Sequence, residues 1–303
     1  MKALFLDCND QLAPVWQRVS RPGDPAIDVN RKPFATDELP GVLDGYDIAI
    51  NDHSYMPTPQ IERCPALKHI VFLGTGPASY MSLADMAAWG IKVHIIKGYG
   101  ETAVAEHTIA LLFAACRDIA RMDREVRGGT WTPHEGVQLL GKTLGVIGLG
   151  GIGSEVLRMG RGLGMEVFAW NRTPKSGAPL VPLDELLARS DVISMNLTLN
   201  DETRGFLRSA QFARMKPGVI FVNTARAGLV DEVAFTAALR SKHIRHAGLD
   251  VFHAEPLKPD NPLAQLDNVT LTAHAAFRTP EASMTLLRRA IDIVRDIVEN
   301  KLK

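Results

Sequence analysis

The feature that most constrains this chain is a glycine-rich turn between an apolar run and a helical stripe. Residues 144–147 form the apolar run, and the motif GLGGIG follows directly at 148–153. Apolar residues then recur at helical spacing, and a second apolar run at 165–170 completes a strand–helix–strand unit. In this context the glycines of G-x-G-x-x-G permit a tight turn, close backbone approach to a pyrophosphate and close helix packing. The unit favours a dinucleotide site, although a plain crossover with a glycine turn also fits the pattern.

The composition is that of an ordinary globular protein with small-molecule partners. The chain has 303 residues, enough for two domains, of which 46% are hydrophobic and 22% charged. Lys plus Arg and Asp plus Glu both number 34, so no net field favours nucleic acid or an anionic membrane. The most apolar long stretch, 103–116, contains Glu106 and His107, which argues against a membrane span. We therefore expect no nucleic-acid partner and no membrane.

The cysteines and the first residues indicate a cytoplasmic location. Cys8, Cys64 and Cys116 are widely spaced and odd in number, with no C-x-x-C pair and no metal-ligand spacing. We interpret them as buried thiols and expect neither a disulfide nor a bound metal. The opening MKALFLDCND has an apolar run of only four residues, which is typical of a first strand and too short for a signal peptide. We also expect no regulatory domain after Lys303.

Apolar runs alternate with polar or helical segments along the chain. In the first hundred residues the runs lie at 3–6, 47–50, 69–73 and 92–96. After the glycine motif they lie at 191–197, 219–223, 247–252 and 269–272. This alternation predicts an α/β fold with two Rossmann-like or flavodoxin-like lobes, each a doubly wound parallel sheet. We expect residues 1–99 with 275–303 to form the catalytic (substrate) domain and 100–274 the dinucleotide-binding domain.

Two long segments with apolar residues at helical spacing predict one helix between the lobes and one at the end of the chain. Residues 101–127 predict one long helix, and its apolar stretch 109–116 predicts burial on several sides, as at a domain junction or subunit interface. Glu106 and His107 on this helix are interpreted as structural. The stripe over 280–302 predicts a terminal helix packed on the first lobe.

Three predicted strand ends bring Arg226, Glu255 and His274 to the sheet edge where the glycine motif would place a nicotinamide. Reduction of a 2-oxo acid needs a cation for the carboxylate, a proton donor for the developing alkoxide, and a partner that keeps the donor charged. Arginine offers a planar fork for a carboxylate, histidine titrates near neutral pH, and a neighbouring glutamate favours the imidazolium. Each residue alone also fits a structural role, but their joint placement favours a catalytic trio. In the first lobe, Gly74-Thr75-Gly76 could present N–H groups to a substrate anion or form a simple turn.

Around these residues the sequence resembles the D-isomer-specific 2-hydroxyacid dehydrogenase family, over nearly the whole chain from Lys68. The motifs that carry the resemblance are the glycine motif, NTARAGLVD at 223–231, GLDVF at 248–252 with the following EP at 255–256, and TAH at 272–274. The chain departs mildly at Ala273, where proline is common, and at Ala227, where glycine is common. Formate dehydrogenases, a related branch, carry glutamine where this chain has Glu255, so that reaction is set aside.

The resemblance implies roles for individual residues. Arg226 would bind and orient the substrate, and His274 would be the acid/base with Glu255 as its partner. Gly74, Thr75 and Gly76 would contact the substrate carboxylate, and Asp250 would reach the carboxamide of nicotinamide. Family members are usually homodimers through the cofactor domain, so we expect a homodimer. The residues that we assign to the cofactor site are Gly148, Gly150, Gly151, Ile152, Gly153, Asn171, Arg172, Thr173, Thr198, Thr203, Thr224, Ala225, Asp250 and Ala276.

The end of the second strand indicates which dinucleotide is preferred. In the NAD-type pattern an Asp or Glu stands roughly 20 residues beyond the glycine motif, where it binds the ribose hydroxyls and repels a 2′-phosphate. Here the strand ends in Asn171-Arg172-Thr173, with Lys175 close behind. Asn171 is neutral, and Arg172 can pair with a phosphate. We expect NADP(H) to be preferred with NAD(H) possible, the alternative being a polar strand end with Arg172 in solvent.

Together these features predict an NAD(P)H-dependent oxidoreductase that interconverts a small 2-oxo acid and its D-2-hydroxy acid. A narrower alternative is a glyoxylate or hydroxypyruvate reductase. An alternative of another class is a dinucleotide-sensing binding protein, since some relatives regulate transcription through the same fold.

Overall fold

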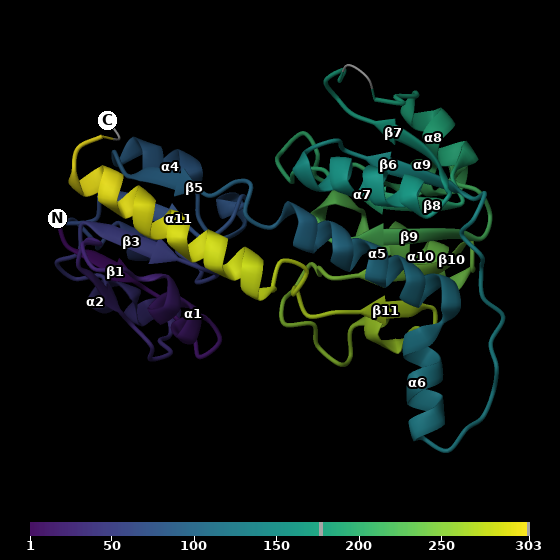
Figure 1. Cartoon of the computed structure of the whole chain (residues 1–303), viewed down its shortest axis with the longest axis horizontal. Helices are drawn as coiled ribbons and strands as arrows, with labels where there is room; N and C mark the ends of the chain where they lie inside the picture. Colours follow the sequence, from purple (N-terminus) through teal and green to yellow (C-terminus); the bar gives the residue numbers. More distant parts are fainter. Residues whose placement is uncertain (176–177, 302–303) are drawn as a thin grey trace. The chain divides into compact units, whose positions relative to one another are not determined.

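The computed structural model describes residues 1–175 and 178–301, which divide into two compact units. The smaller unit comprises Met1–Gly100 and the described residues from Arg278 onward, and the larger unit comprises Glu101–Phe277. Each unit holds one parallel sheet flanked by helices (Figure 1). The predicted α/β fold with two doubly wound sheets is therefore confirmed. The division of labour between a substrate domain and a cofactor domain stays a prediction.

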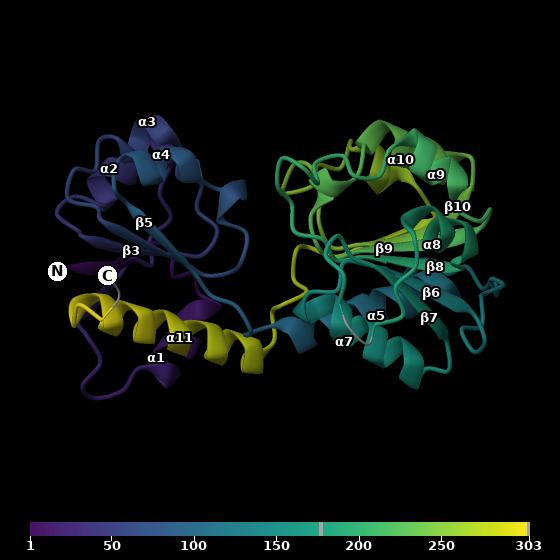
Figure 2. The ribbon, with the colours of Figure 1, turned by 90° about the horizontal axis from the view of Figure 1, so that it is seen from above.

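The sheet of the smaller unit has five parallel strands in the order β2-β1-β3-β4-β5, the flavodoxin-like order. The strands are β1 (Ala3–Phe5), β2 (Ile27–Val29), β3 (Ile48–Asn51), β4 (His69–Phe72) and β5 (Lys92–Ile95). The helices are α1 (Leu12–Val19), α2 (Leu39–Val42), α3 (Thr58–Ile61), α4 (Leu83–Ala88) and α11 (Pro280–Val298). Figure 2 shows α1 and α11 on one face of this sheet and α2, α3 and α4 on the other. Because both faces are covered, β1 and β3 are buried along their whole length and read as continuous apolar runs.

The sheet of the larger unit has six parallel strands in the order β11-β10-β9-β8-β6-β7. The strands are β6 (Thr143–Ile147), β7 (Glu166–Trp170), β8 (Val192–Met195), β9 (Val219–Asn223), β10 (Ile244–Leu249) and β11 (Val269–Leu271). The helices are α5 (Glu101–Arg117), α6 (Ile119–Arg127), α7 (Gly151–Gly162), α8 (Leu183–Arg189), α9 (Ser209–Arg214) and α10 (Glu232–Arg240). Beyond β7, Leu180 forms a single parallel bridge with Ala169. From β6 the chain adds β7 on one side of the sheet and then crosses to add β8 on the other side of β6. This reversal creates a topological switch point between β6 and β8.

Two apolar cores cover the faces of this larger sheet. One core joins α8, α9 and α10 to the sheet and contains the packed rings of Phe212, Phe221 and Phe235. The other joins α5 and α7 to the opposite face through residues such as Leu112 and Val156. The views in Figure 2 show these two helix layers on either side of the strands. Because helices cover both faces of the sheet, its edges and loops are the parts left for binding.

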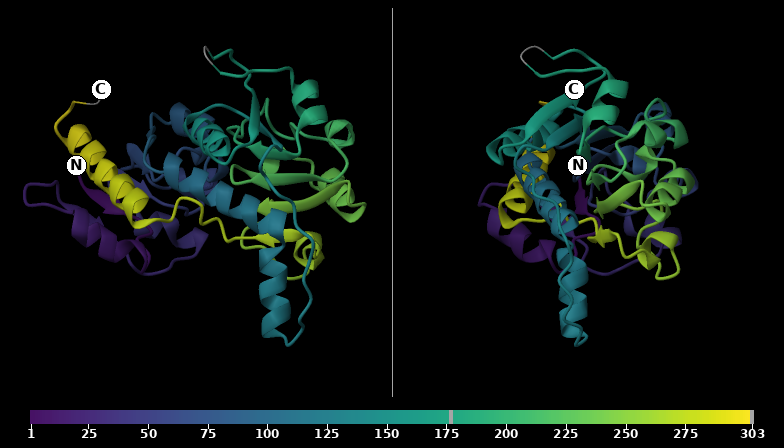
Figure 3. Two further views of the ribbon diagram at one scale, coloured as in Figure 1. Left: turned by 45° about the vertical axis from the view of Figure 1, so that its right-hand side comes forward. Right: turned by 90° about the vertical axis from the view of Figure 1, so that its right-hand side faces the viewer.

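The predicted single helix over 101–127 is wrong, because the chain forms two helices that meet at Asp118. This residue adopts a left-handed conformation with φ 53°, which an aspartate tolerates better than most residues. The helical hydrogen-bond pattern of α5 ends there. Figure 3 shows α6 projecting away from the rest of the larger unit. Within 109–116, Leu111, Leu112, Ala115 and Cys116 are buried in the single chain, whereas Phe113 is 39% exposed. Burial of the remaining side of this stretch at a subunit interface stays a prediction.

The remaining differences from the sequence are at element ends. The sequence predicts a terminal helix up to Leu302, but α11 ends at Val298. Leu302 itself lies outside the described residues. Strand β2 was not predicted, because it has three residues and two of them are exposed. Within the ranges 1–175 and 178–301, no helix is both long and apolar enough to cross a membrane.

Candidate active site

The carboxyl edge of the six-stranded sheet gathers the predicted cofactor and catalytic residues. All six strands are parallel, so their carboxyl ends lie along one edge. The glycine loop follows β6, and Asn171 with Arg172 follows β7. On the other side of the switch point, Arg226 follows β9, and His274 follows β11. The predicted cofactor-binding residues after β6 and β7 therefore lie at one end of this edge, and the predicted acid–base residues lie at the other.

The glycine loop has the space that a pyrophosphate needs. Gly148 has φ +96°, and a Cβ there would lie 2.8 Å from the carbonyl oxygen of Asn196. A Cβ on Gly153 would lie 1.9 Å from the carbonyl oxygen of Gly148, so both positions exclude any other residue. A Cβ on Gly150 would meet nothing within 4 Å, which makes this the open side of the loop. Helix α7 begins at Gly151, and the N–H groups of its first turn have no partners inside the helix. The loop therefore fits a dinucleotide phosphate.

Asn171 ties the end of β7 to the glycine loop. Its Oδ1 accepts the N–H of Leu149 at 3.0 Å, and its Nδ2 donates to the carbonyl of Thr173 at 2.7 Å. The side chain thus has a positioning role that the sequence did not reveal. A direct contact of Asn171 or Thr173 with the cofactor stays a prediction.

Two cations follow Asn171 and have different partners. Arg172 forms an exposed ion pair with Glu202, which lies on the loop after β8. Lys175 donates to the carbonyl of Leu149 at 3.1 Å and to Ser154 Oγ at 3.0 Å, so its charge lies at the glycine loop. The sequence does not identify either partner, because Glu202 lies 30 positions from Arg172 and Ser154 lies 21 positions from Lys175. No local sequence pattern pairs residues so far apart.

Two of the threonines assigned to the cofactor, Thr203 and Thr224, have hydroxyl contacts within the larger unit. Thr203 Oγ1 donates to the carbonyl of Thr198 at 2.7 Å and caps the turn that carries Glu202. Thr224 Oγ1 lies 2.8 Å from Thr108 Oγ1 in a buried pair. These bonds shape the loops after β8 and β9, and cofactor contacts by these threonines stay predictions.

His274 and Glu255 form the short polar contact expected of an acid–base pair. His274 Nδ1 lies 2.6 Å from Glu255 Oε2, and Glu255 Oε1 accepts the N–H of Phe252 at 2.9 Å. Burial acts to raise the pKa of Glu255, but the hydrogen bonds from His274 and Phe252, together with the charge of Arg226, hold that pKa below its usual value. Glu255 is therefore a carboxylate at neutral pH. A proton on Nδ1 directed at this carboxylate makes Nε2 the nitrogen that can exchange a proton with a substrate.

Asp250 builds the turn that carries His274. Its carboxylate is fully buried and accepts the N–H groups of Ala275 and Ala276, both at 2.9 Å, and the hydroxyl of Thr272 at 2.6 Å. Burial acts to raise the pKa of Asp250, but hydrogen bonds led by those of His107 and Thr272 lower it overall. These bonds hold His274 at φ 49°, a conformation that needs support from its surroundings.

The role of Asp250 in this structure is to position His274. His107, which was interpreted as structural, contributes to the same network, with its Nε2 3.0 Å from Thr272 Oγ1. Contacts of Asp250 and Ala276 with the nicotinamide stay predictions.

Arg226 is positioned by its own loop. Asn223 Nδ2 donates to the carbonyl of Arg226 at 3.0 Å, and Asn223 Oδ1 accepts the N–H of Ala225 at 3.0 Å. The guanidinium donates to the carbonyl of Ala225 at 2.6 Å. Arg226 follows β9 on the sheet edge that also carries Glu255 after β10 and His274 after β11, and its charge helps to lower the pKa of Glu255. We refer to these three residues as one cluster.

The loop Gly74-Thr75-Gly76 follows β4 in the smaller unit. Gly74 has φ +155°, and its N–H donates to the carbonyl of Phe72 at 2.8 Å. That amide is therefore used within the turn. If this loop binds a substrate anion, the donors would be the N–H groups of Thr75 and Gly76. This contact stays a prediction.

Comparisons with known proteins agree with this arrangement. Residues 109–276 match the family model described as the NAD binding domain of the D-isomer specific 2-hydroxyacid dehydrogenases. A D-3-phosphoglycerate dehydrogenase of Archaeoglobus fulgidus is 43% identical over 217 residues, which are 69% of this chain and 41% of that protein. The chain thus spans less than half the length of that relative. A glycerate dehydrogenase of Methylorubrum extorquens is 34% identical over 278 residues, which are 88% of both chains.

A solved structure extends the similarity to the whole fold. An acyclic imino acid reductase in complex with NADPH and D-Arg superposes with a TM-score of 0.87 at 30% identity, covering 99% of this chain and 98% of that one. The match includes both units, and the family model lies within the larger one. The resemblance found in the sequence is therefore confirmed.

Proposed function

The chain belongs to the D-isomer-specific 2-hydroxyacid dehydrogenase family, and we propose that it interconverts a small 2-oxo acid and its D-2-hydroxy acid with a nicotinamide dinucleotide. The observation that carries the proposal is the cluster of Arg226 with the bonded pair His274–Glu255, on the same sheet edge as the glycine loop. A binding module for dinucleotides needs the glycine loop but has no use for a histidine held at a carboxylate. The cluster therefore favours an enzyme over a sensor.

The residues present divide the work of such a reaction. A bound dinucleotide would supply the hydride, and the glycine loop with the N-terminus of α7 would hold its pyrophosphate. Arg226 binds the substrate carboxylate through its planar fork. His274 gives the proton from Nε2 to the developing alkoxide, and Glu255 stabilises the charged imidazole and fixes its orientation. In the reverse direction the same nitrogen takes the proton from the hydroxyl.

A narrower proposal is that the substrate is hydroxypyruvate or glyoxylate. It is supported by the glycerate dehydrogenase relative, because the 2-oxo acid that corresponds to glycerate is hydroxypyruvate and the match covers 88% of both chains. The test is a screen of 2-oxo acids by loss of reduced-nicotinamide absorbance. Turnover of at least one small 2-oxo acid supports an enzyme. Tight dinucleotide binding without turnover of any of them would favour the sensor.

For the cofactor we propose a preference for NADP(H), with weaker use of NAD(H). The proposal is supported by the neutral Asn171 and by the two cations Arg172 and Lys175 beyond β7. A charge-assisted contact contributes about 1.5–3 kcal/mol, or roughly 10- to 150-fold in affinity. The measurement is kcat/KM with NADPH and NADH, in the wild type and in Asn171→Asp with Arg172→Ala. Preference for NADH in the wild type, or a double variant that keeps the NADPH preference, would contradict the proposal.

We also propose that the protein is a cytoplasmic homodimer. The cytoplasmic assignment is supported by Cys8, Cys64 and Cys116, which are all buried free thiols. The dimer is supported by apolar side chains that a lone chain leaves in water on the larger unit. Trp131 is 87% exposed, Leu140 is 66% exposed and Phe113 is 39% exposed.

A further inference from the structure

The ion pair between Arg172 and Glu202 has a consequence for cofactor choice. Arg172 is the guanidinium that would bind the 2′-phosphate of NADP(H), but its side chain already contacts a carboxylate. Both side chains are exposed, Arg172 by 65% and Glu202 by 73%. An exposed pair of this kind is weak, so a phosphate dianion can displace it.

Glu202 is held in position by its own turn and not by Arg172 alone. Its N–H donates to Asn200 Oδ1 at 3.1 Å, and the same oxygen accepts the N–H of Thr203 at 3.0 Å. Thr203 Oγ1 in turn accepts the N–H of Asn200 at 2.8 Å. The backbone of Glu202 therefore stays in place when its carboxylate loses Arg172, and a negative charge remains beside the incoming phosphate.

We propose that Glu202 is a specificity-determining residue that competes with the 2′-phosphate of NADP(H) for the guanidinium of Arg172. Binding of NADP(H) exchanges one partner of Arg172 for another, whereas binding of NAD(H) leaves the Arg172–Glu202 pair intact. The chain thus combines cations that attract the phosphate with a carboxylate that limits the attraction. Lys175 differs, since its two contacts are with neutral oxygens. This inference rests on the proposed binding of the 2′-phosphate by Arg172.

The test is the dissociation constant of NADPH and of NADH, measured by isothermal titration calorimetry on the intact chain. Glu202→Gln keeps the size of the side chain and one acceptor oxygen, and it removes the charge. We expect it to tighten NADPH binding about two- to five-fold and to leave NADH binding unchanged, because only NADPH has to displace the pair. In high salt the gain should shrink, since exposed charges are screened.

Two further variants make the result specific. Glu185→Gln removes the carboxylate of another exposed pair, with Arg189 on α8, and should change neither constant. In an Arg172→Ala background, Glu202→Gln should no longer improve NADPH binding. The inference is overturned if Glu202→Gln leaves or weakens NADPH affinity, if it improves NADH equally, or if its gain persists without Arg172.

These outcomes separate the inference from the proposed cofactor preference. A wild type that binds NADH more tightly than NADPH contradicts the preference, but the effect of Glu202→Gln on NADPH can still be measured. Conversely, if Arg172→Ala weakens NADPH binding while Glu202→Gln has no effect, the preference stands and the role of Glu202 is wrong.

Discussion

At the scale of single residues, His274 depends on neighbours that are far away in the sequence. Glu255 binds its Nδ1, and Asp250 holds the turn on which it lies. The motif positions of Glu255 and His274 could be predicted, because the residue types carry the chemistry. The positioning role of Asp250 could not, because it depends on bonds to backbone amides 25 and 26 residues away.

Replacing His274 tests proton transfer. We expect His274→Ala to lower kcat by roughly 10²–10⁴-fold, the usual range for loss of a general acid–base group. The dissociation constant of the dinucleotide should stay close to that of the wild type, because the glycine loop lies after a different strand. The measurement combines steady-state kinetics with a cofactor titration. Near-wild-type turnover would remove His274 from the mechanism.

Replacing Arg226 tests substrate anchoring. Arg226→Lys keeps the charge but loses the planar fork, so kcat/KM should fall by about 10-fold or more. A rise in KM alone would indicate a role in binding only, and a parallel fall in kcat would indicate that Arg226 also stabilises the transition state. An unchanged kcat/KM for the best 2-oxo acid is the result that the assignment does not allow.

At the scale of elements, α11 is anchored in the smaller unit by a largely buried carboxylate, that of Asp24. Asp24 accepts two bonds from Arg288, at 2.8 and 2.9 Å, and its side chain is only 10% exposed. These hydrogen bonds, with one from the N–H of Arg21 and the charges of Arg288 and Arg295, outweigh burial and hold the pKa of Asp24 well below its usual value. The pair therefore links the loop after α1 to the middle of the terminal helix.

We expect Asp24→Asn to lower the free energy of unfolding by about 2–3 kcal/mol at neutral pH, because it removes the paired, largely buried carboxylate and leaves Asp292 as the remaining ion-pair partner of Arg288. Since the folded-state pKa is lowered, this stability is present above the unfolded pKa of about 4 and is lost as pH falls through the folded value. The difference between wild type and variant should therefore narrow in acid.

Urea unfolding at several pH values measures this difference. The matched control is Asp10→Asn. Asp10 pairs with Arg31, and the two side chains are 93% and 56% exposed. This substitution should lower the free energy of unfolding by less than about 0.5 kcal/mol. An Asp24→Asn effect no larger than that of the control would show that the pair does not anchor α11.

Most elements could be predicted from apolar runs, since β3, β6 and β9 are buried on both faces. The exceptions have physical reasons. Strand β2 is short and partly exposed, so its sequence carries no apolar run. The break at Asp118 lies inside a continuous helical stripe, and neither glycine nor proline marks it. Periodicity reports which face is buried but not where the helix axis turns.

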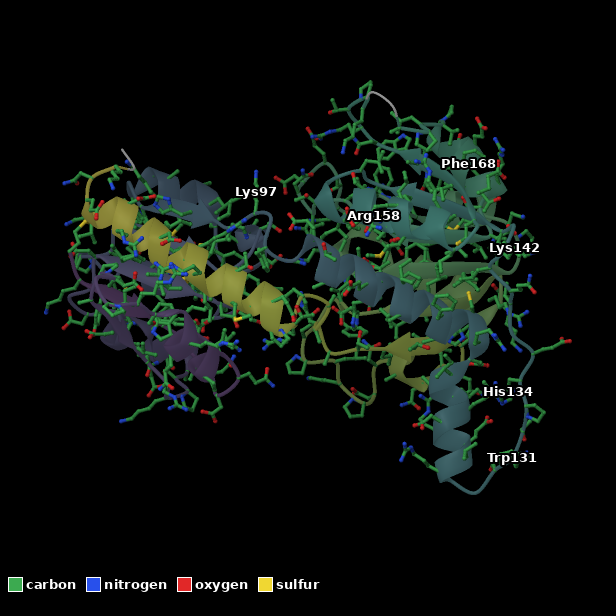
Figure 4. All side chains as sticks on the ribbon, viewed as in Figure 1. Lys97, Trp131, His134, Lys142, Arg158 and Phe168 are labelled. Atoms are coloured by element: carbon green, nitrogen blue, oxygen red, sulfur yellow. The ribbon has the colours of Figure 1, made fainter. Side chains whose placement is uncertain are left out.

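At the scale of the whole molecule, one arm of the larger unit exposes apolar side chains that the proposed homodimer would cover. The arm consists of α6 and the return segment 128–141. His134 Nε2 lies 2.6 Å from Glu125 Oε2 and ties this segment to α6. Figure 4 shows Trp131 and His134 along it. Trp131 is 87% exposed, and a monomer would leave this large, mainly apolar ring in water.

We expect light scattering on the purified chain to give twice the mass of one chain. Trp131→Ser should raise the dimer dissociation constant roughly 30-fold, the effect of losing an interface residue that contributes about 2 kcal/mol. Val233→Ser is the matched control, since Val233 is 82% exposed on α10 and should leave the mass unchanged. A monomeric wild type would contradict the proposed dimer.

In the proposed reaction, a hydride moves between a nicotinamide and C2 of a small 2-oxo acid at the Arg226, Glu255 and His274 cluster. The most direct measurement uses NADPH deuterated at the transferred position of the nicotinamide, with hydroxypyruvate or the best substrate of the screen. The product is then analysed by NMR and by chiral separation. We expect deuterium at C2 of the D-2-hydroxy acid, and loss of this product in His274→Ala. A product of the L configuration, or a product without deuterium at C2, would contradict it.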